Sequence, residues 1–294
     1  LSISSGVPHH AGFASRTWTM PPKKIGILAG GGALPCRITD ACDKNDQAYH
    51  VVVFEGQGDP DSFASKPHDI IRLGAGGATI KCLRKNGCDY VVMAGAIRRP
   101  SVAELRPDWW GIKFFAKSGA QALGDDGLLR ALINALEGEG FTIIGADDLV
   151  PELLMPQSLI ADIQPDDLNK RDIEIAIKAA LSLGEQDIGQ AAVASKGDII
   201  AREGAGGTDA MLRELVAISN TGGVLAKTLK PNQERRVDLP TIGPETIINA
   251  HAAGLKGVAV EAGNAFLLEF DETVAIANDL GVFLVGTDAE GHWS

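Results

Sequence analysis

The chain has 294 residues and carries 38 acidic against 27 basic side chains, which gives a formal net charge of −11. This balance excludes non-specific binding to nucleic acid, which needs a basic surface. The hydrophobic content of 45% and the 35 glycines are typical of soluble α/β enzymes, and the length favours two domains. No apolar run approaches the roughly 20 residues that span a bilayer, so we expect any membrane contact to be peripheral.

Residues 1–19 lack hydrophobic periodicity, and we interpret them as a disordered leader or a cloning remnant. The four cysteines have no CxxC spacing, which predicts reduced core residues in a cytoplasmic protein; they are Cys36, Cys42, Cys82 and Cys88. The six histidines form no HxH or HExxH pair, so the sequence gives no local support for zinc catalysis by histidine.

The first half alternates apolar strands with amphipathic helices. Apolar runs are found at 24–29, 50–55, 69–74, 89–95 and 141–146. The pattern predicts a Rossmann-like domain over residues 20–152, built on a parallel doubly wound sheet. Ligands lie at the carboxyl ends of such strands. We therefore expect one rim to hold Gly30, Gly31 and Gly32, residues 94–100, and Gly124 with Asp125 and Asp126.

The glycine turn GGGALP after the first strand is an incomplete dinucleotide fingerprint. Pro35 takes the third glycine position, and Glu55 only loosely imitates the acidic residue that binds ribose. Glycines are also needed in such turns for the backbone alone. A nicotinamide-dependent oxidoreductase therefore stays open as an alternative, although it leaves the charged cluster of the second half unexplained.

Prolines interrupt the next segment, and we interpret residues 153–167 as a connector within a second domain that covers 153–294. This domain is expected to be mixed α/β. Helices are predicted at 171–183, from Thr208, after Pro244 and at 271–281, and strands in a hairpin that turns at 196–198, at 224–227, within 257–270 and at 282–286. Asp271 is the expected N-cap of the last helix and Gly281 its end.

Residues 225–243 read LAKTLKPNQERRVDLPTIG and concentrate basic side chains in an acidic protein. Ammonium and guanidinium groups form charge-assisted hydrogen bonds with phosphate oxygens, and this segment offers Lys227, Lys230, Arg235 and Arg236. Asp238, and Asp209 in the preceding segment GAGGTDAM, could hold a hard cation or orient water. A solvated charged loop and ordinary helix capping are the alternatives. The combination predicts chemistry on a diphosphate.

Several segments, in order, resemble the UDP-2,3-diacylglucosamine pyrophosphatase family of lipid A biosynthesis, the magnesium-dependent type unrelated to metallophosphoesterases. They are KIGILAGGGALP, MAGAIRRP, GDDGLLR, DIGQ, EGAGGTDAML, LAKTLKPNQERRVDLPTIG and VEAGNAFLL. The resemblance covers residues 23–286. It implies hydrolysis of UDP-2,3-diacylglucosamine to UMP and 2,3-diacylglucosamine 1-phosphate (lipid X), with Mg²⁺ as cofactor and the nucleotide lipid held between two domains.

The resemblance also implies roles for individual residues. Asp238 matches the aspartate of the RVDLPTIG motif that is essential for turnover in the family. We expect Asp238, Lys227 and Asp209 to be catalytic, with Asp238 and Asp209 as metal ligands. The expected substrate-binding residues are Gly30, Gly31, Gly32, Arg98, Arg99, Asp125, Asp126, Gln190, Thr208, Lys230, Gln233, Arg236 and Thr241.

One departure from the family pattern concerns the glycine-rich segment. Where the family commonly has a glutamate before GTD, this chain has Gly206 and Gly207, which leaves Glu203 as a candidate substitute for the missing carboxylate. A non-catalytic protein that binds a nucleotide sugar or a lipid therefore also stays open. The expected partners are the substrate and its lipid product, without nucleic acid. Contact with the inner face of the inner membrane and a homo-oligomer stay open.

Overall fold

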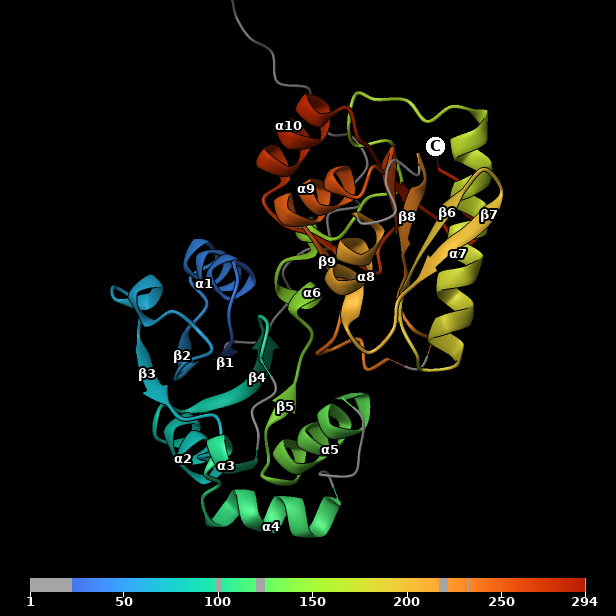
Figure 1. Ribbon diagram of the computed structural model, residues 1–294. Coiled ribbons are helices and arrows are strands. Elements are labelled where there is room, and N and C mark those ends of the chain that lie inside the picture. Colours follow the sequence, from blue (N-terminus) through green and yellow to red (C-terminus); the bar gives the residue numbers. More distant parts are fainter. Residues whose placement is uncertain (1–22, 99–101, 120–124, 217–221, 232, 294) are drawn as a thin grey trace, which may run out of the picture.

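The computed structural model describes residues 23–98, 102–119, 125–216, 222–231 and 233–293, and within the helices the side chains of residues 102, 103, 125 and 126 are not described. Two α/β halves lie side by side, each built on its own five-stranded sheet (Figure 1). The expected leader, residues 1–19, falls outside the described residues. None of the described helices is long and apolar enough to cross a membrane.

The first sheet is fully parallel, with the strand order β3-β2-β1-β4-β5. Its strands are β1 (Lys24–Ala29), β2 (Tyr49–Phe54), β3 (His68–Ile71), β4 (Cys88–Ala94) and β5 (Thr142–Ile143). The central strands β1 and β2 are almost wholly buried, because helices cover both faces of the sheet. The parallel sheet predicted for the first half is confirmed.

Each face of the first sheet has its own core. Helices α1 (Leu34–Lys44) and α6 (Ala146–Leu149) pack on one face. Helices α2 (Gly76–Lys85) and α5 (Asp125–Gly138) pack on the other. The short helices α3 (Val102–Leu105) and α4 (Trp109–Ser118) follow β4. Strand β5 is shorter than the apolar run 141–146, because α6 begins within that run. Gly145 is the N-cap of α6, and Asp147 and Asp148 lie in its first turn, where acidic side chains are favourable.

The second sheet is mixed, with the strand order β12-β10-β8-β6-β7. Strands β8 (Val224–Lys227), β10 (Gly257–Glu261) and β12 (Phe283–Thr287) are parallel, whereas β6 (Ala191–Ser195) is antiparallel to β8 and to β7 (Asp198–Arg202). The mixed α/β class predicted for this half is confirmed, and so is the hairpin.

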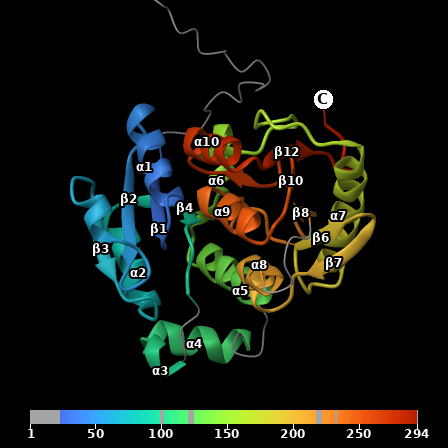
Figure 2. The same ribbon diagram turned by 45° about the horizontal axis from the view of Figure 1, so that its top comes forward.

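Helices again cover both faces of this sheet. Helix α7 (Asp167–Glu185) packs on the outer face, whereas α8 (Gly207–Val216), α9 (Pro244–Ala252) and α10 (Phe270–Leu280) pack on the face toward the first half (Figure 2). Gly281 ends α10 with a φ of 67°, as expected, but Asp271 is not its N-cap. The helix begins at Phe270, one residue before Asp271. Asp271 therefore lies in the first turn, where its carboxylate interacts favourably with the helix dipole.

The predicted strand–turn–strand over 257–270 places its two strands in different sheets. Strand β10 is internal to the second sheet, whereas β11 (Phe266–Leu267) pairs in parallel with β9 (Thr241–Ile242) in a separate two-stranded sheet. This small sheet joins the segment after β10 to the end of the charged loop, which we define as residues 228–240 between β8 and β9.

The proline-rich segment after the first sheet is irregular, and it is fixed to the second half. The Gly286 N–H of β12 donates to the Ser158 carbonyl at 2.9 Å, and the Ile160 N–H donates to the Leu284 carbonyl at 2.8 Å. A Cβ atom placed on Gly286 would lie 1.8 Å from the carbonyl oxygen of Pro156. Glycine is therefore needed at 286 for the close approach of two backbones.

We expect Gly286→Ala to lower the free energy of unfolding by about 1–3 kcal/mol, because the added methyl must push the connector away from β12. Gly138→Ala is the control, since a Cβ atom there meets no heavy atom within 4 Å and α5 gains a better helix former. Urea denaturation of both variants measures the difference. Equal stability of Gly286→Ala and the parent chain would contradict the packing described.

Candidate functional site

A cavity of about 320 Å³ lies between the two halves and has walls from both. The first half contributes the glycine turn and the end of β4, and the second half contributes the charged loop with β9 and β11. Among the lining residues are Gly31, Gly32, Met93, Gly95, Arg236, Asp238, Thr241 and Phe266. Five of these were expected at the site from the sequence, namely Gly31, Gly32, Arg236, Asp238 and Thr241.

The first-half wall is formed by the glycine turn, which packs against the chain that follows β4. The Gly30 N–H donates to the Ala94 carbonyl, and the Gly31 N–H donates to the Ala96 carbonyl, both at 2.8 Å. A Cβ atom on Gly30 would lie 2.5 Å from the Ala96 oxygen, so this approach requires glycine. Of the rim expected from residues 30–32 and 94–100, the contact of residues 30–31 with residues 94–96 is thus observed. Gly124, which was also expected there, lies outside the described residues. A wider hollow of about 540 Å³, lined by residues 30–32 and 56–63, adjoins the turn.

The charged loop is held in place by Arg235. Its guanidinium donates from Nε to Asp147 of α6 at 3.1 Å, from Nη2 to the Gly263 carbonyl at 2.6 Å, and from Nη1 to Asn264. Asp147 is itself buried, and it belongs to the first half. Arg235 therefore joins the loop to both halves and fixes where the following residues lie.

Arg236 points to a different set of partners. Its guanidinium pairs with Glu234 through Nε and Nη2 at 3.0 and 2.9 Å, and with Glu137 of α5 through Nη1 at 2.8 Å. These two carboxylates raise the pKa of Arg236. Any substrate phosphate at this cation would have to share it with them.

Lys227 is the last residue of β8 and lies on the sheet face toward the first half, as its pairing with Val260 indicates. Its ammonium donates to the Thr241 carbonyl at 3.0 Å. Burial lowers the pKa of Lys227, and the carboxylates of Glu203, Asp209 and Asp238 partly offset this by favouring the charged form. Three carboxylates thus favour the charged form of a half-buried ammonium beside the cavity.

Glu203 organises the start of α8. Its buried carboxylate accepts the Gln190 N–H at 2.6 Å on Oε2 and the Thr208 hydroxyl at 2.8 Å on Oε1. Helix α8 begins at Gly207, so Thr208 and Asp209 lie in its first turn. Asp209 is exposed, and its Oδ1 accepts from the Asn249 side chain at 3.4 Å. Glu203, named from sequence only as a substitute for a missing carboxylate, is a central member of the cluster.

Asp238 is fixed by its own loop. Its Oδ2 accepts from the side-chain amide of Gln233, and its N–H donates to the Glu234 carbonyl at 3.1 Å. Gln233 in turn accepts the Lys230 N–H on Oε1 at 3.2 Å. The expected residues Gln233 and Asp238 are therefore in contact. Gln233 is hydrogen-bonded to the carboxylate that lines the cavity, but it is not itself part of the cavity wall.

Of the remaining expected residues, Lys230 and Arg98 pair with carboxylates outside this cluster, whereas Gln190 is bonded to Glu203 through its N–H. The Lys230 ammonium contacts Asp187 at 3.0 Å, and the Arg98 side chain is 3.7 Å from Glu104. The side-chain oxygen of Gln190 is buried without a hydrogen-bond partner in the described part of the chain. Asp125 and Asp126 begin α5, but their side chains are outside the description, and Arg99 lies outside the described residues.

Sequence reasoning missed the acceptors that position the charged loop. Asp147 and Asn264 hold Arg235 of this loop. Gln57, which was also missed, accepts the Arg98 N–H at 2.8 Å in the segment after β4. Asp147 was visible only as an acidic residue after an apolar run, and Asn264 only as part of a turn between strands. Arg235 is 88 residues away from Asp147 and 29 residues away from Asn264 in the sequence, so neither position carries a local signal for this contact.

We expect Glu203→Gln to lower the free energy of unfolding by about 1–3 kcal/mol, because a buried amide cannot accept both hydrogen bonds and its NH2 group faces a donor. Glu214→Gln on the exposed side of α8 is the matched control, with an expected change within about 0.5 kcal/mol. Urea denaturation compares the two variants. Similar stabilities of both would show that Glu203 does not organise α8.

The comparisons with known proteins cover both halves of the chain. The family model described as the LpxI N-terminal domain matches residues 24–153, and the LpxI C-terminal domain matches residues 156–285. The chain is 39% identical over 277 residues to "UDP-2,3-diacylglucosamine pyrophosphatase LpxI" of Caulobacter vibrioides, which covers 91% of this chain and 99% of the relative. The solved structure of CobK precorrin-6A reductase aligns over 92% of this chain and 94% of its own, with a TM-score of 0.31 and 14% identity. With both family models matched in order and a curated relative aligned over nearly its whole length, the chain belongs to the LpxI family.

Proposed function

We propose that this protein hydrolyses the diphosphate of UDP-2,3-diacylglucosamine to UMP and 2,3-diacylglucosamine 1-phosphate, as a step of lipid A biosynthesis. The observation that carries the proposal is the cavity between the two halves, which is lined by Asp238 and by Thr241, whose carbonyl accepts the hydrogen bond of the Lys227 ammonium. The printed name of the Caulobacter vibrioides relative supplies the substrate class. A cavity lined by backbone glycines on one side and by charged side chains on the other fits a nucleotide joined to a diphosphate.

The two walls would bind different parts of the substrate. On the first-half side, Gly31 and Gly32 have no side chains, so a bulky planar or phosphate group can approach the backbone closely. The adjoining hollow lined by residues 56–63 extends this surface beyond the cavity. On the second-half side, Arg236 and the nearby Lys227 would face the phosphate oxygens. We expect the acyl chains to leave the cavity along its apolar lining, which includes Leu239, Phe266 and Leu268.

Asp238 would orient the attacking water and accept its proton as the water oxygen forms a bond to phosphorus. The Gln233 amide holds the carboxylate in one orientation, which lowers the cost of placing the water. The Lys227 ammonium would stabilise the negative charge that develops on the diphosphate oxygens as the bridging P–O bond breaks. Because Lys227 lies in a desolvated position, its charge acts with little screening by water.

The residues at the cavity also fit Mg²⁺. This cation prefers oxygen ligands and is commonly held by one or two carboxylates together with substrate phosphates. Asp238, which lines the cavity, and Asp209, which lies in the first turn of α8, are the two carboxylates that could serve. When bound, Mg²⁺ would supply Lewis-acid stabilisation of the diphosphate.

We expect Asp238→Asn to lower kcat for UMP release from UDP-2,3-diacylglucosamine by about 10²–10³-fold, because the amide can hold water but cannot accept its proton. Substrate affinity should change little, since Gln233 and Arg236 stay in place. Asp198→Asn, on the exposed strand β7, is the control and should keep full activity.

The measurement is the release of UMP with Mg²⁺ and with EDTA, combined with calorimetric binding of the substrate to each variant. Turnover of Asp238→Asn close to that of the parent chain would remove Asp238 from the mechanism. Tight binding of the substrate without UMP release by the parent chain in Mg²⁺ would instead support a non-catalytic binding protein.

A further inference from the structure

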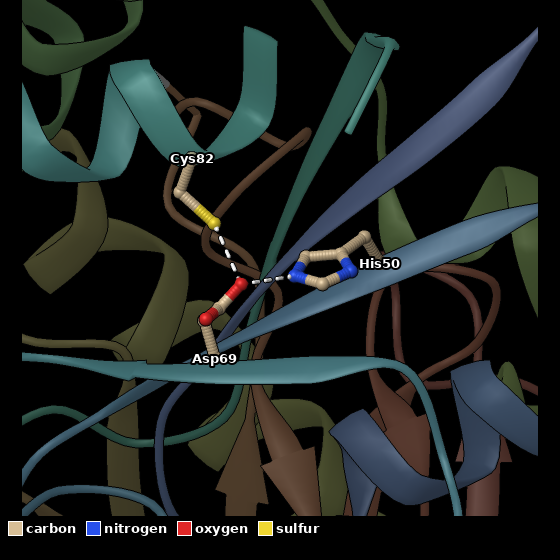
Figure 3. A group of neighbouring side chains, drawn as sticks. All are labelled: His50, Asp69 and Cys82. Carbon is tan, nitrogen blue, oxygen red and sulfur yellow. Dashed lines mark hydrogen bonds and ion pairs between the residues drawn. The ribbon is translucent and has the colours of Figure 1, made fainter. Parts of the chain in front are cut away.

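We propose that His50, Asp69 and Cys82 form a second site, which binds a divalent cation of the zinc type at the edge of the first sheet. The three side chains come from β2, β3 and α2 and point toward one another (Figure 3). Their ligand atoms all lie within 4.8 Å of one another. In the described part of the chain, no other group of three or more histidine, cysteine or acidic side chains is arranged in this way.

The geometry of the cluster is close to that of a metal site. His50 Nε2 lies 2.9 Å and Cys82 Sγ lies 3.3 Å from the same oxygen of Asp69. In a tetrahedral zinc site with ordinary bond lengths, neighbouring nitrogen and oxygen ligands are about 3.4 Å apart, and sulfur and oxygen ligands about 3.6 Å. Both distances to Asp69 are therefore within a few tenths of an ångström of the values in a zinc site, and the sulfur and nitrogen atoms lie within 4.8 Å of each other.

The donor set selects the type of cation. One thiolate, one imidazole and one carboxylate suit Zn²⁺ or Co²⁺, whereas Mg²⁺ and Ca²⁺ prefer oxygen ligands alone. The site is therefore distinct in chemistry from the carboxylates near Lys227. Three protein ligands leave a fourth position for water.

Access to the site comes from the Asp69 side. The Asp69 side chain is 52% exposed, whereas only 8% of the His50 side chain is exposed and Cys82 is buried. The sulfur and nitrogen ligands are thus shielded from solvent, and the carboxylate faces it. A hydrated ion could reach Asp69 first and lose its water as it contacts the other two ligands.

The charge of the cluster favours a cation. In the described chain, Asp69 forms no ion pair with a lysine or an arginine, and its recorded partners are the His50 ring and the Cys82 thiol. Binding would release the Cys82 proton to solvent, move the imidazole proton from Nε2 to Nδ1, and leave the ion bound to a thiolate and a carboxylate. The product is a neutral site in place of one uncompensated carboxylate.

The location of the cluster indicates a structural or sensing role. His50 is the second residue of β2, at the amino end of the sheet, whereas the cavity described above lies at the carboxyl ends of the strands. Strand β3 is an edge strand of four residues, and the ion would tie it to β2 and to α2. Binding to the folded state alone would stabilise the first half. The inference does not rest on the proposed hydrolysis.

The test uses the full chain in its reduced, metal-free form, titrated with Co²⁺ and with Zn²⁺. The informative variants are Cys82→Ser and His50→Gln. The matched controls are Cys36→Ser, a thiol outside the cluster, and His68→Gln, a histidine next to Asp69 whose Nδ1 contacts the Lys66 carbonyl at 3.0 Å instead. Melting curves in EDTA establish that each variant is folded before titration.

We expect the parent chain and both controls to bind one Co²⁺ with a thiolate-to-metal charge-transfer band and to melt at a higher temperature in Zn²⁺. Cys82→Ser should lose the band, and both cluster variants should bind Zn²⁺ at least about tenfold more weakly. Absence of the band in the parent chain, or equal Zn²⁺ affinity in Cys82→Ser and the parent chain, would overturn the proposal. UMP release should be the same in Cys82→Ser and the parent chain, which separates this site from the catalytic one.

Discussion

The arrangement of the candidate site depends on the guanidinium of Arg235. It contacts Asp147 from the first half and Gly263 and Asn264 from the second, so that one side chain joins three segments. The hydrogen bonds are charge-assisted, and the Asp147 carboxylate is buried, which makes the loss of either partner costly. An ion pair in such a position contributes more to a defined geometry than to net stability. Its consequence is that Arg236, Asp238 and Thr241, which follow directly, form the second-half wall of the cavity.

The two halves have different parts in this site. The second half supplies the charged side chains, with Lys227 among three carboxylates, and the first half supplies a backbone surface without side chains. The glycine turn resembles a dinucleotide-binding turn, but two of its backbone N–H groups already donate hydrogen bonds within the protein. Gly30 and Gly31 donate to the carbonyls of Ala94 and Ala96, so these N–H groups are not free to bind a pyrophosphate as the dinucleotide fingerprint requires. This observation disfavours the oxidoreductase reading of the first half.

Much of the fold could be predicted from local pattern. The apolar runs of the first half predicted its strands within three residues at every end, because a buried parallel strand is a continuous hydrophobic run. The errors occur where a distant contact overrides the local pattern. Asp271 looked like an N-cap, but α10 begins a residue earlier after Glu269, which has a φ of 48° and an ion pair with Arg37 of the first half. Strand β11 pairs with β9 instead of its neighbour β10, because the segment between β10 and β11 turns toward the connector, where the Met155 N–H donates to the Ala265 carbonyl.

For the site, the sequence by itself determined the residue types and their order: a glycine turn, a glycine-rich helix start and a basic loop with one aspartate. These features are local in the chain, so their chemistry can be inferred from the sequence alone.

Only the tertiary structure decided which of the charged side chains meet. Glu203 lies near Lys227 because its N–H donates to the Ala191 carbonyl of β6, and Ala191 pairs with Lys227 of β8. Arg236 is paired with Glu137, 99 residues away. The same holds for His50, Asp69 and Cys82, whose spacing in the sequence matches no metal motif. They meet because parallel pairing of β2 with β3 and the packing of α2 on that face bring three distant positions within a few ångströms.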